Sequence, residues 1–415
     1  MNSCSEDGAR GFRHGPPSGD SAFLASWTEY SVILACIDVD CDEGARLRTS
    51  LSRFVRWDEL VGRSVQHGML ALLRRSISAY CPDLVPPEVY HKLGALQRAN
   101  VERALRMTSH LLRLLEELRR VGIEALPFKG PVLAEYVYGD VGERQMADLD
   151  ILVRQRDITT ARELLHRGGY VTVDDGGFPT ADDGPTGRRL FASEREVMLH
   201  HSSLDLLVEI HWGTGPRFGR ASFSAEELLD RARPSTLWGR PILTLHPEDR
   251  FLVLCTHGAT HQWDRLEGVA TLAALLQKES DADWDLRLKH AADRGCLYRC
   301  LVGIALVAKT SPTSLPGDLE ETLSRHPRAT RLALEALSQA CRPPMPPSLA
   351  VGFKGLQWQS RCLDTSPERV LHLISRLVTP GRRDWEWVSL PASLHGLYYL
   401  VRPFRAAAQY LDRGR

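Results

Sequence analysis

The chain has 415 residues, 43% of them hydrophobic, which exceeds the usual size of a single-core domain and is enough for two or three packed units. Lysine plus arginine and aspartate plus glutamate each number 52, which excludes the strong overall basic field that attracts nucleic acid or an anionic membrane. The nine cysteines are odd in number and widely scattered, which is typical of reduced thiols in a cytoplasmic protein rather than of a secreted disulfide framework.

The two ends of the sequence lack the apolar runs of targeting or membrane segments. Residues 1–21 are rich in glycine and proline and have no apolar core of a signal peptide, so a loose tail is expected. Near the other end, residues 387–399 are apolar but interrupted by Pro391 and His395, and they are fewer than the roughly 20 needed to span a bilayer. We therefore expect a protein without a membrane anchor.

The first third of the chain has a helical pattern. Residues 22–110 are broken at Pro82 and at Pro86–Pro87 and contain no motif that suggests chemistry. From residue 101 to about residue 122, apolar residues recur mostly every three or four positions. That spacing predicts a helix with one buried face.

Between residues 123 and 212, short apolar runs alternate with turn residues, which predicts a compact α/β unit with a mixed sheet. The expected strands are residues 123–128, 149–153, 170–173, 197–201 and 204–212. Helices are expected over 131–138 and 157–166, the second capped by Asp157, and a polar loop over 174–189. Ser202–Ser203 is expected to join the last two strands as a hairpin.

Helices return after residue 247, and a proline-rich joint at residues 343–347 precedes a last helical segment. The helices expected here are residues 248–261, 266–278, 284–294 and 297–309. The predicted fold class is therefore α+β, a small mixed sheet flanked by helical regions. The predicted divisions are a tail at 1–21, a helical region at 22–110, a core at 111–245, a helical domain at 246–342 and a C-terminal helical segment at 343–415.

Two acids on one strand are the first sign of chemistry. In the run from Met146 to Val153, acidic and aliphatic residues alternate, so Asp148 and Asp150 face the same side about 7 Å apart. Their mutual repulsion is relieved by a cation between them, and carboxylate oxygens suit Mg²⁺. An Asp-x-Asp pair alone is equally typical of a solvated strand end, so further acids are needed to support a metal site.

Glu209 is such an acid, because it interrupts a strand that is otherwise apolar from Leu206 to Ile210, where an unpaired carboxylate is costly to bury. If this strand lies beside that of Asp148, the three carboxylates form a cage for two ions that activate a hydroxyl and stabilise leaving pyrophosphate. His211 shares the face of Glu209, where a catalytic role and a hydrogen-bonded histidine at a strand end both stay open. Asp205 is a weaker candidate on the same face.

A predicted anion site lies upstream, where Lys129 and Gly130 end one strand and begin a helix. Backbone N–H groups and the helix dipole favour an anion there, Gly130 permits close approach of a phosphate, and Lys129 adds a positive charge. Arg144, four residues before Asp148, is either a further phosphate contact or a solvated charge.

Four motifs together resemble the uncharacterised nucleotidyltransferase family of the DNA polymerase β-like superfamily. They are Leu126-Pro127-Phe128-Lys129-Gly130, Tyr138-Gly139-Asp140, the run from Arg144 to Val153, and Val208-Glu209-Ile210-His211-Trp212. The resemblance covers about residues 111–276. It implies a polymerase β-like core that transfers a nucleoside monophosphate from an NTP to an acceptor, with Asp148, Asp150 and Glu209 as metal ligands.

The sequence departs from the superfamily at one place and from the family at another. The usual Gly-Ser of the phosphate-binding helix is Lys129–Gly130 here, so serine-based phosphate contacts cannot be assumed. After Trp263, Gly268 and Thr271 stand where the family often has tryptophan and aspartate, which puts nucleotide or acceptor contacts from that helix in doubt.

Two other pairs have metal-binding spacing. Cys296 and Cys300 lie four residues apart without a second pair at zinc-like spacing, so core or surface thiols are favoured. His257 and His261 stand at helical i, i+4 positions without a glutamate between them or an obvious third ligand. For this pair we expect a structural or nucleotide-contacting role.

The sequence therefore predicts an enzyme with two Mg²⁺ ions and an NTP substrate, ATP being expected, and an unidentified acceptor. Neutral charge disfavours a long RNA as that acceptor. Two alternatives remain: a catalytically silent nucleotide-binding or scaffold protein of the same fold, and a metal-dependent glycosyltransferase. The latter requires a nucleotide-binding α/β unit before Asp148, where the sequence is helical.

Overall fold

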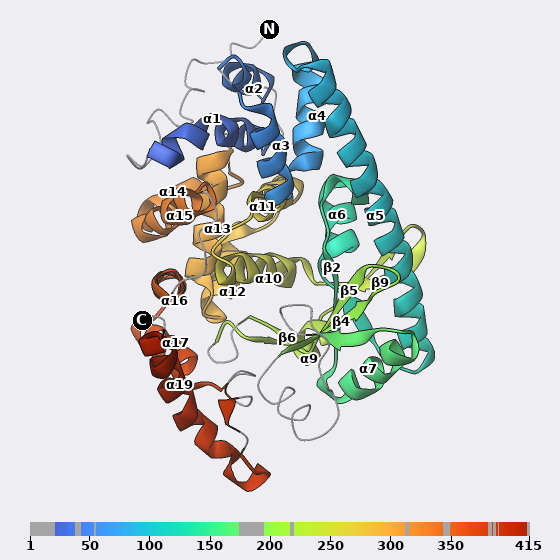
Figure 1. The fold of residues 1–415 in the computed structure, drawn as a ribbon, viewed down its shortest axis with the longest axis vertical. Coiled ribbons are helices and arrows are strands. Elements are labelled where there is room, and N and C mark those ends of the chain that lie inside the picture. Colours follow the sequence, from blue (N-terminus) through green and yellow to red (C-terminus); the bar gives the residue numbers. More distant parts are fainter. Residues whose placement is uncertain are drawn as a thin grey trace. The chain divides into compact units, whose positions relative to one another are not determined.

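The computed structural model describes residues 21–37, 43–53, 55–173, 195–215, 220–311, 315–342, 349–380, 384, 387–388 and 390–412. The fold is α+β, mostly helical with one five-stranded mixed sheet (Figure 1). The loop expected at 174–189 and the joint expected at 343–347 lie outside the described residues.

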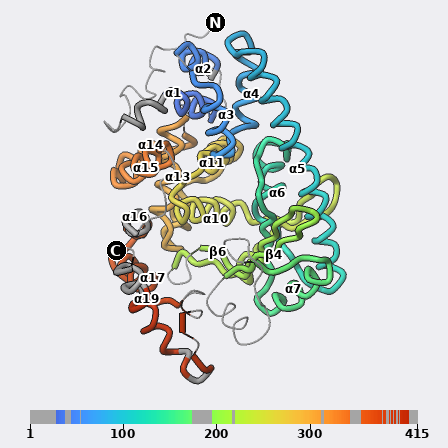
Figure 2. Tube along the Cα trace, viewed as in Figure 1, coloured from blue at the N-terminus to red at the C-terminus, as the bar shows by residue number. Residues whose placement is uncertain are grey.

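Contacts divide the chain into two compact units, each built from separated stretches of sequence. Unit 1 comprises Met1–Arg113, Lys129–Met146 and Pro247–Met345, and unit 2 comprises Leu114–Phe128, Ala147–His246 and Pro346–Arg415. Figure 2 colours the Cα trace by residue number, so the separate stretches that make up each unit can be followed in it. The sequence prediction divided the chain into consecutive ranges, whereas each of these units combines separated ranges.

Unit 1 is helical. Its helices are α1 (Ser21–Ala35), α2 (Glu43–Leu51), α3 (Trp57–Gln66), α4 (Leu70–Tyr80), the larger part of α5 (Pro87–Arg120), α6 (Gly130–Tyr138), α10 (Pro247–Thr260), α11 (Leu266–Lys278), α12 (Trp284–Asp293), α13 (Leu297–Thr310), α14 (Leu319–Arg325) and α15 (Pro327–Ala340). Helix α13 packs against α10, α11, α12 and α15, and its residues Leu301, Val302 and Ile304 are fully buried. The helix predicted to start at residue 101 starts at Pro87, where proline is tolerated in the first turn.

A buried charge cluster around Glu279, at the end of α11, ties four helices of unit 1 together. Its carboxylate accepts hydrogen bonds from the Tyr136 hydroxyl at 2.7 Å and from Arg250 at 2.9 Å, and Arg287 donates to its other oxygen. The Arg250 guanidinium also lies 3.7 Å from the centroid of the Tyr136 ring. Because Tyr136 belongs to α6, this cluster fixes α6 against α10, α11 and α12.

Unit 2 contains the sheet, in the order β1-β2-β5-β4-β3. Its strands are β1 (Ala125–Pro127), β2 (Asp148–Val153), β3 (Val171–Val173), β4 (Glu196–His201) and β5 (Leu206–His211). Only the β2–β5 pair is parallel; the other neighbours are antiparallel. Two small ribbons, β6 (Gly213–Thr214) with β7 (Phe223–Ser224) and β8 (Arg233–Leu237) with β9 (Arg240–Thr244), were not anticipated.

The helices of unit 2 include the last residues of α5. The others are α7 (Ile158–Arg167), α9 (Ala225–Asp230), α16 (Leu349–Arg361), α17 (Ser366–Val378) and α19 (Tyr398–Asp412). Short 3₁₀ turns complete the chain at Pro82–Leu84, Val141–Glu143, Gln155–Asp157 and Ala392–Leu397. Asp157 precedes α7 as expected, but its side chain makes no capping hydrogen bond there.

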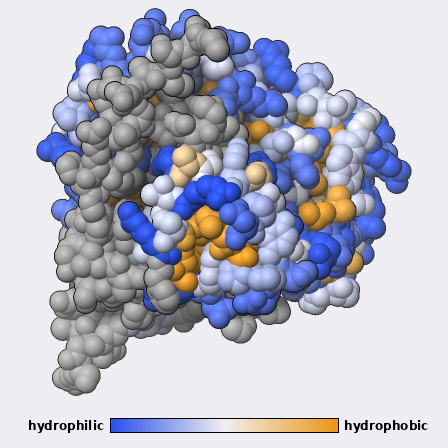
Figure 3. Space-filling model, turned by 90° about the horizontal axis from the view of Figure 1, so that it is seen from above, coloured by the Kyte–Doolittle hydropathy of each residue, from blue (hydrophilic) through white to orange (hydrophobic). Residues whose placement is uncertain are grey.

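The hydropathy of the surface and the state of the described cysteines can be compared with what the composition predicts. The part of the face that Figure 3 colours is mainly hydrophilic, with smaller hydrophobic areas among the hydrophilic residues. No helix within the described ranges has the length and apolar character needed to cross a bilayer. The seven cysteines that the structure describes, Cys296 and Cys300 among them, are buried, and none of the seven forms a disulfide.

Candidate functional site

Strand β2 presents its two acids on one face and its aliphatic residues on the other. Leu149, Ile151 and Val153 are at most 1% exposed, which confirms the prediction that this face enters the core. The alternation of side chains places Asp148 and Asp150 on the opposite face. Asp150 is almost completely buried, whereas Asp148 at the start of the strand is partly exposed.

Strand β5 brings Glu209 beside Asp150. The two strands pair in parallel, with Asp150 opposite Glu209 and Asp148 opposite Leu207. The neighbouring residues Val208 and Ile210 point into the core with no exposure, so Glu209 and His211 share the acidic face. The adjacency on which the three-carboxylate hypothesis depends is therefore present for Asp150 and Glu209.

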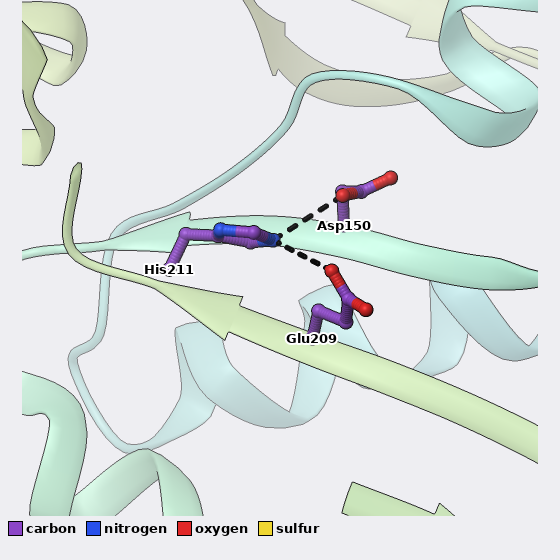
Figure 4. A group of neighbouring side chains, drawn as sticks. All are labelled: Asp150, Glu209 and His211. Atoms are coloured by element: carbon purple, nitrogen blue, oxygen red, sulfur yellow. Dashed lines mark ion pairs between the residues drawn. The ribbon is translucent and has the colours of Figure 1, made fainter. Parts of the chain in front are cut away.

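His211 completes a compact group with these two acids (Figure 4). Its Nε2 lies 3.2 Å from Asp150 Oδ1 and 3.3 Å from Glu209 Oε2. One donor atom from each of the three residues lies within 4.8 Å of the others. Asp148 is outside this group, which is the one group of three or more potential ligands found among the described residues.

Glu196, which the sequence interpretation missed, contacts the other side of the imidazole. It begins β4 directly opposite His211, and its Oε2 lies 3.1 Å from His211 Nδ1. The Phe128 ring packs edge-on against the imidazole, with centroids 5.1 Å apart. The alternation of side chains along β4 would predict that Glu196 contacts His211, but only once the register of the β4–β5 hairpin is known.

The group has more negative than positive charge. Burial alone would lower the pKa of His211, but the carboxylates of Asp150, Glu196 and Glu209 outweigh it and raise that pKa well above its ordinary value. The cluster therefore attracts positive charge at the point where Nε2 and the two carboxylates meet. A proton on His211 supplies one such charge, and a divalent cation supplies two.

The donor atoms fit a metal ion. First-row dications bind nitrogen and oxygen at about 2.0–2.2 Å, which places donors on the same ion about 3.0–3.5 Å apart. The distances from Nε2 to the two oxygens, 3.2 and 3.3 Å, fall in that range. Neither contact has hydrogen-bond geometry, so Nε2 is a buried nitrogen without a hydrogen-bond partner among the described residues.

The predicted phosphate-binding segment begins α6 in unit 1. Lys129 occupies the N-cap position and Pro131 the first turn. Gly130 has φ of +53°, a left-handed conformation that favours glycine over residues with a Cβ atom. The glycine is therefore explained by the backbone at the start of this helix.

Arg144 is neither solvated nor isolated. Its Nε forms an ion pair with Glu267 of α11, and both side chains are at most 15% exposed. The Thr271 hydroxyl donates to the same carboxylate at 3.2 Å. Glu267 directly precedes Gly268, one of the two positions at which the sequence departs from the family, and the sequence did not indicate it because a single helical glutamate carries no motif.

The loop that leads to β2 is held by side chains of α5. Gln97 and Asn100 both donate to the Gly142 carbonyl, at 3.1 and 2.8 Å, and Arg103 Nε donates to the Met146 carbonyl at 3.1 Å. The helical region that showed no chemical motif in the sequence thus contacts the segment immediately before Asp148.

The histidine pair His257 and His261 belongs to no metal cluster found among the described residues. The rings of His257 and His261 lie side by side on α10 and just beyond it, with centroids 4.5 Å apart. No third ligand joins them among the residues that the structure describes. The expected structural or nucleotide-contacting role of the pair stays a prediction.

Comparison with known proteins identifies a family. The model of a family described as "Uncharacterised nucleotidyltransferase" matches residues 54–312, which is more than half of the chain and extends upstream of the resemblance recognised in the sequence. No curated protein and no solved structure matches the chain. The matched range includes α3 to α5, the whole sheet and the Asp150, Glu209 and His211 group. The chain belongs to the uncharacterised nucleotidyltransferase family.

Proposed function

We propose that the protein transfers a nucleoside monophosphate from an NTP, ATP in the first instance, to a hydroxyl group of an acceptor. One observation carries the proposal: in a member of this family, Asp150, Glu209 and His211 direct ligand atoms to one point on the polar face of a buried sheet. We further propose that β1, β2 and β5 form a polymerase β-like core, with Asp148, Asp150 and Glu209 as its metal ligands.

In the proposed reaction, the acceptor oxygen forms a bond to the α-phosphorus, the bond from that phosphorus to the bridging oxygen breaks, and pyrophosphate leaves. Divalent ions, when bound, neutralise charge on the phosphates and lower the pKa of the attacking hydroxyl. We assign the acceptance of the hydroxyl proton to Glu209, because its side chain is 16% exposed whereas that of Asp150 is 2% exposed. Asp148, partly exposed at the start of the same face, is assigned to the ion that accompanies the nucleotide.

We assign phosphate binding to Lys129, Gly130 and Arg144. Lys129 and Gly130 begin a helix, where free N–H groups favour an anion. Glu267 pairs with the Nε of Arg144 and so orients the planar guanidinium group. His211 is assigned to nucleotide binding on the polar face of the sheet, where it contacts both carboxylates.

The alternatives differ in what they predict. A silent scaffold has no use for carboxylates left in excess over cations, which cost free energy in a buried site. A glycosyltransferase needs a nucleotide-binding α/β unit ahead of the acids, whereas α3, α4 and α5 stand there. The acceptor stays open, and a neutral chain favours a small molecule or protein over a long RNA.

The test is pyrophosphate release from each of the four NTPs with Mg²⁺ or Mn²⁺ and a pool of candidate acceptors. Glu209→Gln removes one carboxylate charge at constant shape and should abolish release, while Asp205→Asn, in the exposed turn before β5, should leave it unchanged. Asparagine tolerates the positive φ of 47° at position 205, so the control preserves the hairpin. Full activity of a folded Glu209→Gln protein would refute the proposal, and nucleotide binding without release would favour the silent scaffold.

A further inference from the structure

His211 has the geometry of a metal ligand. The residue is 4% exposed, and its Nε2 faces the carboxylates of both Asp150 and Glu209 without hydrogen-bond geometry to either. A buried ring nitrogen in that situation is left without the partner that such groups normally have. The three residues are drawn in Figure 4, where the imidazole edge points between the two acids.

Glu196 determines which nitrogen of His211 is available. Its Oε2 lies 3.1 Å from Nδ1, so when a cation replaces the proton on Nε2, the proton of the neutral ring stays on Nδ1, facing Glu196, and the lone pair lies on Nε2. Metal-binding histidines commonly have a carboxylate on the second nitrogen in this way, which fixes the tautomer and raises the basicity of the ligand. The edge-on contact of Phe128 further restricts rotation of the ring.

A nitrogen donor changes which ion the site prefers. Mg²⁺ favours oxygen ligands and keeps much of its water, whereas imidazole suits first-row transition metals, which also accept carboxylates. Two carboxylates and one imidazole within 4.8 Å therefore favour an ion of the Mn²⁺ class over Mg²⁺. All four residues, Glu196 included, belong to unit 2, so the donor set is complete within one compact part of the protein.

We propose that Asp150, Glu209 and His211 Nε2 together bind a first-row transition-metal dication in preference to Mg²⁺, with Glu196 as the positioning residue for His211. This assignment deepens the proposed function, on which it rests, by naming the ion at one of its two positions. The nucleotide-bound ion, assigned to Asp148 and the phosphates, has only oxygen ligands and stays Mg²⁺ in this scheme.

The experiment uses Mn²⁺ as the probe with the full-length protein and no nucleotide. Continuous-wave electron paramagnetic resonance measures the dissociation constant, and pulsed measurements detect the coupling of ¹⁴N to bound Mn²⁺. We expect one tight Mn²⁺ ion with a nitrogen coupling, and a Mg²⁺ dissociation constant, from competition, about tenfold or more higher. His211→Asn should remove the nitrogen coupling.

Glu196→Gln is the second variant. Because the Glu196 side chain is exposed, this variant should fold even if His211→Asn does not. It should weaken Mn²⁺ binding by about 10–100-fold, as the loss of a ligand-orienting carboxylate does elsewhere. His261→Asn is the matched control, because His261 is exposed and lies in unit 1. This control should keep both the affinity and the nitrogen coupling.

Three results would overturn the assignment: Mn²⁺ bound without nitrogen coupling, coupling that survives in His211→Asn, or coupling lost in His261→Asn. Equal affinity for Mg²⁺ and Mn²⁺ would overturn the preference. The proposed function fails separately: nitrogen-coupled Mn²⁺ without pyrophosphate release refutes catalysis and keeps the metal assignment. Pyrophosphate release with Mg²⁺ but without nitrogen coupling keeps the proposed function and overturns the metal assignment.

Discussion

Two buried charge clusters in this protein are built in opposite ways. In unit 1, the single carboxylate of Glu279 is surrounded by two guanidinium groups and a tyrosine hydroxyl, all hydrogen-bonded to it. In unit 2, the carboxylates of Asp150, Glu209 and Glu196 surround one imidazole, whose Nε2 lacks a hydrogen-bond partner among the described residues. The first cluster has the cations that its acid needs, whereas the second has acids in excess.

The difference separates a structural cluster from a binding one. Removing one member of a fully paired buried cluster leaves an uncompensated charge and destabilises the fold. Removing one acid from a cluster with excess negative charge relieves repulsion and leaves the fold intact, but it takes away a ligand. Stability and function should therefore respond in opposite ways to substitutions in the two clusters.

The largest expected effect is on catalysis. Asp150→Asn should lower the rate of pyrophosphate release by roughly 10³-fold, because several kcal/mol of transition-state stabilisation depend on the ion it holds. Urea denaturation of the metal-free variant should give a free energy of unfolding equal to or above that of the wild type. A large loss of stability would show that Asp150 belongs to a structural cluster after all.

The opposite result is expected for Glu279. Glu279→Gln should lower the free energy of unfolding by about 3–5 kcal/mol, because two buried guanidinium groups lose their counter-charge. Turnover per folded molecule should be retained below the unfolding transition. Glu320→Gln, on the exposed face of α14, is the control and should change stability by less than about 0.5 kcal/mol. Comparable stability of both variants would contradict the structural assignment.

Ligand-induced stabilisation should occur only where the second cluster is complete. At a Mn²⁺ concentration 100 times its dissociation constant, the wild type should gain about 2.7 kcal/mol, seen as a rise in the midpoint of thermal unfolding. Glu279→Gln should gain as much as the wild type from its lower starting point, whereas Asp150→Asn should gain little. An equal rise in all three proteins would place the ion elsewhere.

The smallest expected effect concerns His67, a buried histidine whose pKa is influenced by two cations, Arg265 and Arg63, and by no carboxylate. Burial, with further contributions from Arg265 and Arg63, lowers its pKa to about 4. The unfolded chain then binds a proton that the folded protein does not, so stability should be full above pH 6.5 and fall as the pH decreases towards 4. Between pH 7 and pH 5 the loss should be about 2 kcal/mol.

The contribution of His67 is isolated by subtracting the pH profile of His67→Gln from that of the wild type, each measured by urea denaturation. A difference that does not vary between pH 7 and pH 5 would show that His67 is solvated. It would also contradict the contrast with His211, which depends on burial lowering the pKa of a histidine that has no acidic partner.

Much of the fold was accessible from local patterns. The alternation in β2 correctly assigned Leu149, Ile151 and Val153 to the core, and the helix over residues 266–278 has the predicted bounds, because both signals lie within one element. The partner of His211 was not accessible, since it depends on the hairpin loop. Strands β4 and β5 are joined by residues 202–205, with Asp205 at positive φ, instead of Ser202–Ser203 alone. The longer loop shifts the register by two residues and brings Glu196 opposite His211.

Tertiary pairing explains the other gaps. Nothing near Arg144 in sequence indicates Glu267, because α11 lies more than a hundred residues further along. Likewise, Asp148 and Asp150 form one motif in the sequence, yet only Asp150 stands opposite Glu209, since the parallel register places Leu207 beside Asp148. The roles assigned to Asp148, Lys129 and Arg144 stay predictions for the proposed reaction.

The parallel pairing of β2 with β5 also bears on how the chain folds. Asp150 and Glu209 are neighbours in the sheet although they are 59 positions apart in the sequence, and such long-range pairings form slowly because the loop must close before contacts are gained. The ligand set therefore does not exist in the unfolded chain or in its local hairpins. Time-resolved Mn²⁺ capture during refolding would accordingly mark the moment at which the central strand pair of unit 2 is assembled.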